Sequence, residues 1–303
     1  VTHWTDTLFS FRVTRPASWP GAVDTMIGFP TDHRALYDAM RRQMLRDSGS
    51  QGMAMPAEYM FNDVPHRDGV PDGDPVEVTL EEMDAHGVDV GLVSVSAAPE
   101  VTERALQDHP DRFVASYTVD PNRCMDQIRE LVEAHERHGL RAVSVFPHGV
   151  QPQVPIDAPL MYPVYAKCVE LGLPIFITVG VAGPRVPSKC QKVELLDQVL
   201  YDFPDLVVVM RHGAEPWVEH AVKLMVKWPN LHFSTSAFAP RYYSPAIVDY
   251  ANSRGADRIL YGGYYPMGLE LERIFAELPD VGFADDVWPK FLRHNAARVL
   301  GLA

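Results

Sequence analysis

Short apolar runs alternate with longer segments of helical periodicity along almost the whole chain. The runs are rich in β-branched and aromatic residues, which is typical of strands buried on both faces in a parallel sheet. Eight of these runs are predicted to be strands, at residues 22–27, 88–95, 113–119, 140–146, 173–178, 206–210, 231–234 and 258–261.

The segments between these runs carry helix signals. Thr79 and Glu82 form a capping box, and Gly87 is placed to end the helix that they begin. Further helices are predicted near residues 100–108, 123–138, 158–171, 191–202, 216–227, 244–254, 267–277 and 287–299. Eight alternations favour an α/β fold of the closed (β/α)8 TIM barrel kind over a doubly wound sheet. With 303 residues, 47% of them hydrophobic, the chain is long enough for one such domain over residues 1–303.

The segment at residues 28–78 is far longer than an ordinary connection between a strand and a helix. Because it follows the first strand, we expect it at the C-terminal mouth of the barrel, where active sites are built. Its large apolar side chains are Tyr37, Met40, Met44, Met53, Met55, Tyr59, Met60 and Phe61. They predict an insertion that acts as a lid or pocket wall, and an oligomer contact or a small satellite core is the alternative.

Charge and cysteine content narrow the class of partner. The formal net charge is −13 and no basic block occurs, so we expect neither nucleic acid nor an anionic membrane as a partner. Cys124, Cys168 and Cys190 lie far apart, which argues against a disulfide framework and against a thiolate zinc site. No apolar run reaches the roughly 18 to 20 residues that cross a membrane. We therefore expect a cytoplasmic protein with a small-molecule substrate, and homo-oligomerisation stays open.

The sequence lacks the signatures of serine hydrolases, P-loop proteins, dinucleotide-binding proteins and zinc proteases. Five stretches instead carry a different pattern, at residues 23–24 (VD), 173–178 (LPIFIT), 209–217 (VMRHGAEPW), 258–266 (RILYGGYYP) and 295–301 (NAARVLG). They resemble the amidohydrolase-related barrels that include aminocarboxymuconate-semialdehyde decarboxylase, resorcylate decarboxylases and related hydratases and lactonases.

The chain departs from that family at the positions that the resemblance assigns to metal ligands. The family's D-x-H-x-H motif has Met26 and Gly28 at the two histidine positions, Thr178 replaces the fifth-strand histidine, and Tyr264 replaces the eighth-strand aspartate. A thioether, a glycine, a hydroxyl and a phenol do not make a stable zinc site. We therefore predict no metal and no other cofactor. A relocated site, in which His33, His66 or His148 converges with His212, is the alternative.

Candidate catalytic residues remain at the expected mouth. His212 matches the family's sixth-strand histidine, and the resemblance implies an acid–base role, which suits an imidazole near neutral pH. His148 follows the fourth strand and would face the same mouth. Tyr264 would donate a hydrogen bond to a substrate carbonyl in place of the lost cation.

Four further residues are predicted to contact the substrate. Met26, Gly28 and Thr178 would shape the pocket. Glu215 would orient His212 or bind substrate, although a carboxylate in such a loop is also typical of a helix cap. Arg34, Arg185 and Arg241 are weaker candidates for pairing with a substrate carboxylate.

Three functions are consistent with this set of residues. The leading hypothesis is a metal-independent hydrolase of a small ester, lactone or related carbonyl compound, with His212 as general acid or base. The second is a decarboxylase or hydro-lyase that acts on a small β-keto or unsaturated acid. The third is a barrel that binds a small molecule without catalysis, in which replacement of His212 would change affinity only modestly.

Overall fold

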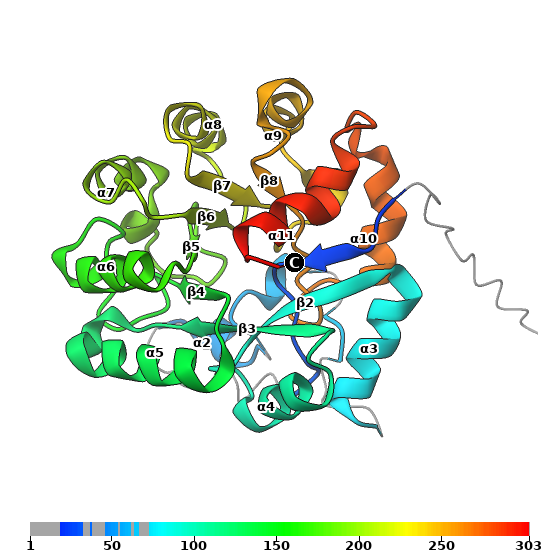
Figure 1. Cartoon of the computed structure of the whole chain (residues 1–303), viewed down its shortest axis with the longest axis horizontal. Coiled ribbons are helices and arrows are strands. Elements are labelled where there is room, and N and C mark those ends of the chain that lie inside the picture. Colours follow the sequence, from blue (N-terminus) through cyan, green and yellow to red (C-terminus); the bar gives the residue numbers. More distant parts are fainter. Residues whose placement is uncertain are drawn as a thin grey trace, which may run out of the picture.

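The computed structural model describes residues 19–32, 37, 46–53, 55–61, 64–66 and 73–302. Eight parallel strands pair in chain order (Figure 1). They are β1 (Ala22–Asp24), β2 (Val88–Ser94), β3 (Phe113–Thr118), β4 (Ala142–Val145), β5 (Ile175–Thr178), β6 (Val208–Arg211), β7 (Leu231–Ser234) and β8 (Ile259–Leu260). Where β8 meets β1, Thr25 donates a backbone hydrogen bond to Tyr261, and Ile27 forms a parallel bridge with Tyr265. The predicted TIM barrel is confirmed.

Helices surround the strands (Figure 1). They are α2 (Ser48–Gln51), α3 (Pro75–His86), α4 (Pro99–Asp108), α5 (Cys124–His138), α6 (Tyr162–Leu171), α7 (Leu196–Asp202), α8 (Val218–Lys227), α9 (Pro245–Tyr250), α10 (Leu271–Glu277) and α11 (Asn295–Val299). Within the described residues, none is long and apolar enough to cross a membrane.

Helix α3 begins earlier than the capping box indicated. Asp74 is its N-cap, accepting from the backbone N–H of Val76, and Pro75 occupies the first turn. Thr79 instead donates its hydroxyl to the Pro75 carbonyl inside the helix. The predicted start was therefore wrong, whereas the end at Gly87, in the left-handed conformation, is confirmed.

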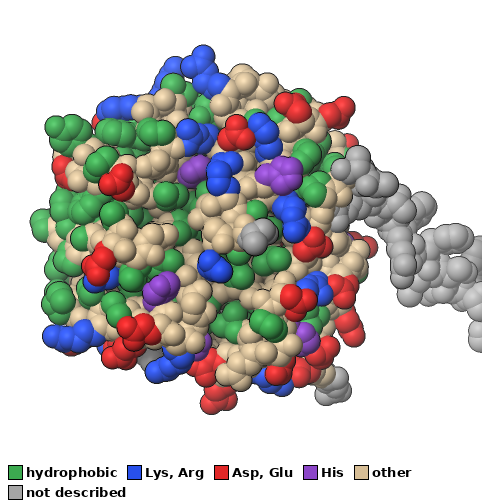
Figure 2. Space-filling model, in the orientation of Figure 1, with side chains coloured by type: hydrophobic (Ala, Val, Ile, Leu, Met, Phe, Trp, Pro, Cys, Tyr) green, Lys and Arg blue, Asp and Glu red, His purple; other side chains and the backbone are tan. Residues whose placement is uncertain are grey.

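The barrel interior has an apolar lower layer. Val23, Phe176, Val209 and Leu260 pack there with α11, which covers the N-terminal end of the strands. Arg141 and Arg293 fasten this end through hydrogen bonds to backbone carbonyls. Figure 2 shows the same face, on which acidic and basic side chains are interspersed.

The next layer towards the C-terminal mouth is polar. Hydroxyls of Ser94, Thr118 and Ser144 form a chain across β2, β3 and β4, with oxygens 3.2 and 2.9 Å apart. On the opposite side, the Thr25 and Ser234 hydroxyl oxygens lie 3.0 Å apart. The fold thus places two groups of bonded hydroxyls towards the C-terminal ends of the strands.

Candidate active site

His212 lies just after β6 in a strained stretch of backbone. His212, Gly213 and Ala214 all adopt positive φ values, of 64°, 88° and 64°. Non-glycine residues adopt this conformation at an energetic cost, and it is sustained only where surrounding structure enforces it, which is typical of functional sites. The turn places the His212 ring among Phe146, Ser236 and Tyr264, which follow β4, β7 and β8.

The His212 imidazole is held in its neutral form. Its Nδ1 lies 3.2 Å from the Ser236 hydroxyl oxygen, and its ring stacks on Phe146 with centroids 6.0 Å apart. Burial, with the nearby charge of Arg211, lowers the pKa of His212 to about 3, although a hydrogen bond to the Ser236 backbone opposes this shift. In the tautomer in which Nδ1 donates its hydrogen to Ser236, Nε2 keeps a lone pair and can accept a proton.

His148 presents a second neutral imidazole. Gln191 donates its amide N–H to the Gly180 carbonyl over 2.9 Å, so its own oxygen must accept from His148 Nδ1. His148 Nε2 is then the acceptor atom, and burial lowers the pKa of His148. Both imidazole rings contact Phe146, with centroids 6.3 Å away for His148 and 6.0 Å away for His212. The structure thus brings these two predicted residues together.

Gly180 supports both histidines and gives a testable prediction. Its φ is +91°, and an added Cβ would lie 3.0 Å from the Ala214 backbone. We expect Gly180→Ala to lower the free energy of unfolding by about 2 kcal/mol or more, through backbone strain and this clash. Urea denaturation measures the loss. Gly282→Ala is the matched control because Gly282 has a φ of +84° and open space around it; equal losses in the two variants would contradict the proposed clash.

Tyr264 completes the set of predicted catalytic residues. It follows β8 with a φ of +85°, and its backbone N–H donates to the Met26 carbonyl over 2.7 Å. Its ring meets the edge of His212 with centroids 5.3 Å apart. Burial raises the pKa of Tyr264 to about 12, so the phenol keeps its proton and can serve as a hydrogen-bond donor.

Asp24 secures the loops that carry Met26 and Tyr264. Its Oδ1 accepts from the backbone N–H groups of Met26 and Gly263, each over 2.8 Å. Burial raises the pKa of Asp24 to about 6. Asp24 therefore joins β1 to the loop after β8, a role that its place in the sequence motif did not reveal.

Arg211 is not among the residues that the sequence patterns singled out. It is only 4% exposed, lies over the Phe176 ring at 4.4 Å and donates from Nη2 to the Thr25 carbonyl over 2.8 Å. Burial lowers the pKa of Arg211 to about 9, which leaves it charged at neutral pH. The sequence did offer one signal: Arg211 lies two residues after Val209 in the predicted strand, so the two side chains are expected on the same, inward face.

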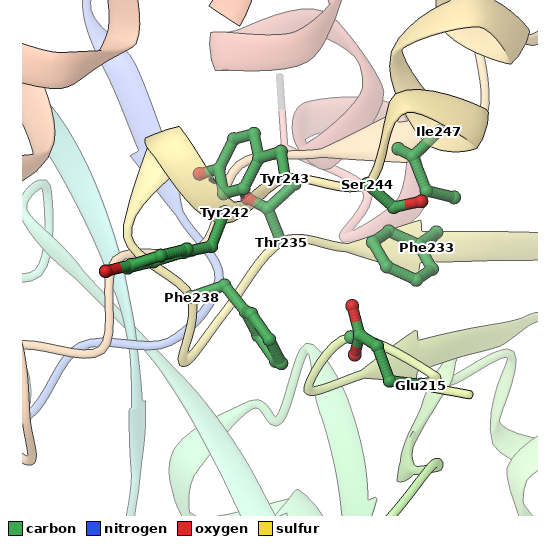
Figure 3. A pocket seen from close by; sticks show the side chains of 9 residues that line it. Glu215, Phe233, Thr235, Phe238, Tyr242, Tyr243, Ser244 and Ile247 are labelled. Carbon is green, nitrogen blue, oxygen red and sulfur yellow. Dashed lines mark hydrogen bonds between the residues drawn. The ribbon is translucent and has the colours of Figure 1, made fainter. Parts of the chain in front are cut away.

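The predicted substrate-contacting residues divide into two groups. Met26 and Gly28 are half-buried in the loop after β1, and buried Thr178 pairs with Arg211 in the register of β5 and β6. Glu215 instead lines a small pocket with Phe233, Phe238 and Tyr243 between β7 and α9 (Figure 3). Burial raises the pKa of Glu215 to about 6. A role for Glu215 in substrate binding stays a prediction.

The described part of the insertion lies against the mouth. Phe61 stacks on Tyr264 with ring centroids 5.9 Å apart, and the Tyr59 hydroxyl donates to the Gly183 carbonyl over 2.6 Å. Arg185 forms a salt bridge with Asp47, which engages it within the fold. Met55, Ala57 and Val64 form a small apolar cluster. His33, Arg34, Met40 and Met44 lie outside the described residues, and the lid role stays a prediction.

The residues at the family's ligand positions do not fit a divalent metal ion. Met26, Gly28, Thr178 and Tyr264 offer no imidazole or carboxylate at these positions. Across the described ranges, no three histidine, cysteine, aspartate or glutamate side chains are grouped to hold a metal. His66, one candidate for a relocated site, lies with Nε2 3.0 Å from the Tyr265 hydroxyl.

Solved structures with this architecture include proteins of several activities. A TIM-barrel protein from Bordetella bronchiseptica is 24% identical, with a TM-score of 0.72 and coverage of 93% of this chain and 98% of that one. A 5-carboxyvanillate decarboxylase from Novosphingobium aromaticivorans, solved with manganese, is 18% identical, with a TM-score of 0.67 and coverage of 94% and 98%. A 4-oxalomesaconate hydratase from Rhodopseudomonas palustris is 19% identical, with a TM-score of 0.58 and coverage of 93% and 96%.

Sequence comparison adds the family. A search of curated proteins finds no match. The model of the amidohydrolase family matches residues 57–302, from the insertion to the closing helix. This match spans well over half of the chain, which therefore belongs to the amidohydrolase family.

Proposed function

We propose that this protein is a lyase that acts on a small carboxylic acid without a divalent metal. The observation that carries the proposal is the pairing of a neutral base, His212, with a protonated phenol, Tyr264, in edge contact above the buried Arg211 cation. Two of the similar solved structures, a decarboxylase and a hydratase, support the lyase class over the hydrolase.

Elimination of water from a β-hydroxy acid uses both groups. His212 accepts the α-proton at Nε2, and the C–H electron pair forms the new carbon–carbon double bond. The β-hydroxyl leaves as water with the proton that Tyr264 donates, and solvent returns the proton from His212 to Tyr264. Such proton transfers contribute about 10² to 10⁴ in rate. Addition of water to the unsaturated acid is the reverse reaction.

Decarboxylation of a β-keto acid belongs to the same proposal. The bond to the carboxylate carbon would break and carbon dioxide would leave. The electron pair of that bond would form the carbon–carbon double bond of an enolate, while the carbonyl π pair moves to the ketone oxygen, where Tyr264 donates a hydrogen bond. Water would then protonate the enolate carbon.

Hydrolysis of an ester or lactone is the second candidate. A neutral imidazole can accept a proton from water, and a phenol can hold the oxyanion, so the same residues serve it.

The proposal is tested with a panel of β-hydroxy acids, α,β-unsaturated acids, β-keto acids and lactones, each assayed before and after chelator treatment. We expect turnover of at least one acid, with less than twofold change on chelation, because the ligand positions do not fit a metal. Metal content measured on the same samples is the control. Turnover confined to lactones would favour the hydrolase, and loss of turnover on chelation would overturn metal independence.

A further inference from the structure

We propose that Arg211 and Thr178 form a binding site for the carboxylate of the substrate, inside the barrel below His212. This inference rests on the proposed function because it names the group that recognises the acid. The two residues face each other on adjacent strands, in the register that pairs Thr178 with Arg211. Thr178 lies two residues after Phe176, and Arg211 lies two residues after Val209. Side chains two residues apart on a strand share a face, so both point into the barrel with the lower layer.

Both side chains are buried with unused hydrogen-bonding capacity. Thr178 is 3% exposed and its Oγ1 has no partner among the described residues, and the same holds for Nε of Arg211. Buried polar groups in native proteins are almost always paired, so two orphaned groups side by side point to a ligand. A guanidinium Nε–H and a hydroxyl both donate to anionic oxygen.

Arg211 also lacks a dedicated counter-ion. Within the described part of the chain it forms no salt bridge, and its one hydrogen bond is to the neutral Thr25 carbonyl. The nearest acidic group that acts on it electrostatically is Asp24, which forms no salt bridge with it; both backbone amides that bind Asp24 donate to Oδ1, and its Oδ2 has no hydrogen-bond partner among the described residues. A buried charge without a partner is costly, and an anionic ligand would offset that cost.

The chemistry favours a carboxylate over other anions. A guanidinium matches the two oxygens of one carboxylate side by side, and a single cation balances a single negative charge. The surrounding hydroxyls of Thr25 and Ser234 are already bonded to each other, which leaves Thr178 as the additional donor. The carboxylate would then sit beneath His212 and Tyr264, with the carbon next to it turned towards both residues.

The test measures binding, independently of turnover. Thermal unfolding of the full chain is followed with acetate or benzoate and with the neutral amides acetamide or benzamide, at matched ionic strength. We expect at least one carboxylate, but neither amide, to raise the melting temperature in a saturable manner. Arg211→Met should weaken binding of that carboxylate at least tenfold, and Thr178→Val should weaken it about tenfold. Arg129→Met, which removes an exposed arginine of α5, should leave binding unchanged.

The variants also separate binding from a structural role. Without ligand, we expect Thr178→Val to raise the melting temperature, because it removes a buried hydroxyl that has no partner. A structural hydroxyl would give the opposite shift, so this variant remains decisive even where Arg211→Met fails to fold. Equal responses to carboxylates and amides, or a carboxylate response that persists in Arg211→Met and Thr178→Val, would overturn the site.

Failure of this site and failure of the proposed function look different. Carboxylate binding that depends on Arg211, without turnover of any acid in the panel, would contradict the lyase activity but support the carboxylate site. Turnover of an acid with an unchanged KM in Arg211→Met and in Thr178→Val would contradict the carboxylate site but support the lyase activity.

Discussion

Replacing His212 with glutamine is expected to lower kcat/KM for the active acid by about 100-fold or more, with the fold retained. Glutamine can still hydrogen-bond to Ser236, but it cannot accept a proton at the position of Nε2. The measurement is steady-state kinetics of wild type and His212→Gln on the substrate found with the panel. The loss is expected in kcat, because His212 acts on the reacting proton.

The matched control is His220→Gln, the same exchange at an exposed histidine on α8. It should leave kcat/KM unchanged. A His212→Gln variant that turns over within threefold of wild type would contradict the catalytic role. A protein that binds carboxylates, turns over none of the panel and tolerates His212→Gln with modest change in affinity would instead be the non-catalytic barrel.

Acid is expected to destabilise the fold through its buried neutral histidines. His232 on β7 is 5% exposed, and burial, with the charges of Arg258 and Arg298, lowers its pKa to about 3. Because the folded-state pKa lies below the unfolded value, the stability that His232 contributes is full above about pH 6.5 and is lost as pH falls towards 3. The expected loss is about 1.4 kcal/mol per pH unit between about pH 6 and 4.

The measurement is the free energy of unfolding in urea at several pH values, for wild type and His232→Leu. The wild-type curve should fall more steeply on acidification than that of the variant. His212 contributes to the pH dependence in the same direction as His232. Asp24 acts in the opposite direction, because its raised pKa stabilises the fold as pH falls below about 6. The difference between the two curves is therefore the informative quantity, since it isolates His232. Parallel curves would contradict a buried neutral His232.

The sequence by itself determined the barrel and the candidate catalytic residues at its C-terminal mouth. Apolar runs that alternate with helical segments favour this architecture because parallel strands need a crossover after each strand. A residue at the end of a strand then lies at the mouth, which is how His212, His148 and Tyr264 could be placed. The replacement of the family's metal-ligand residues could also be recognised from the sequence, because the donor atoms that a side chain offers follow from the residue type alone.

Only the tertiary structure decided which side chains meet and which protonation states they adopt. Thr178 faces Arg211 through the β5–β6 register, and Asp24 bonds to Gly263 only because the barrel closes. The lone pair on Nε2 of His148 follows from the hydrogen bonds that Gln191 makes. Glu215 lines a pocket with Phe238 although only two residues lie between it and His212. Strand register, ring closure and burial act between residues far apart in the chain, and local patterns of hydrophobicity do not encode them.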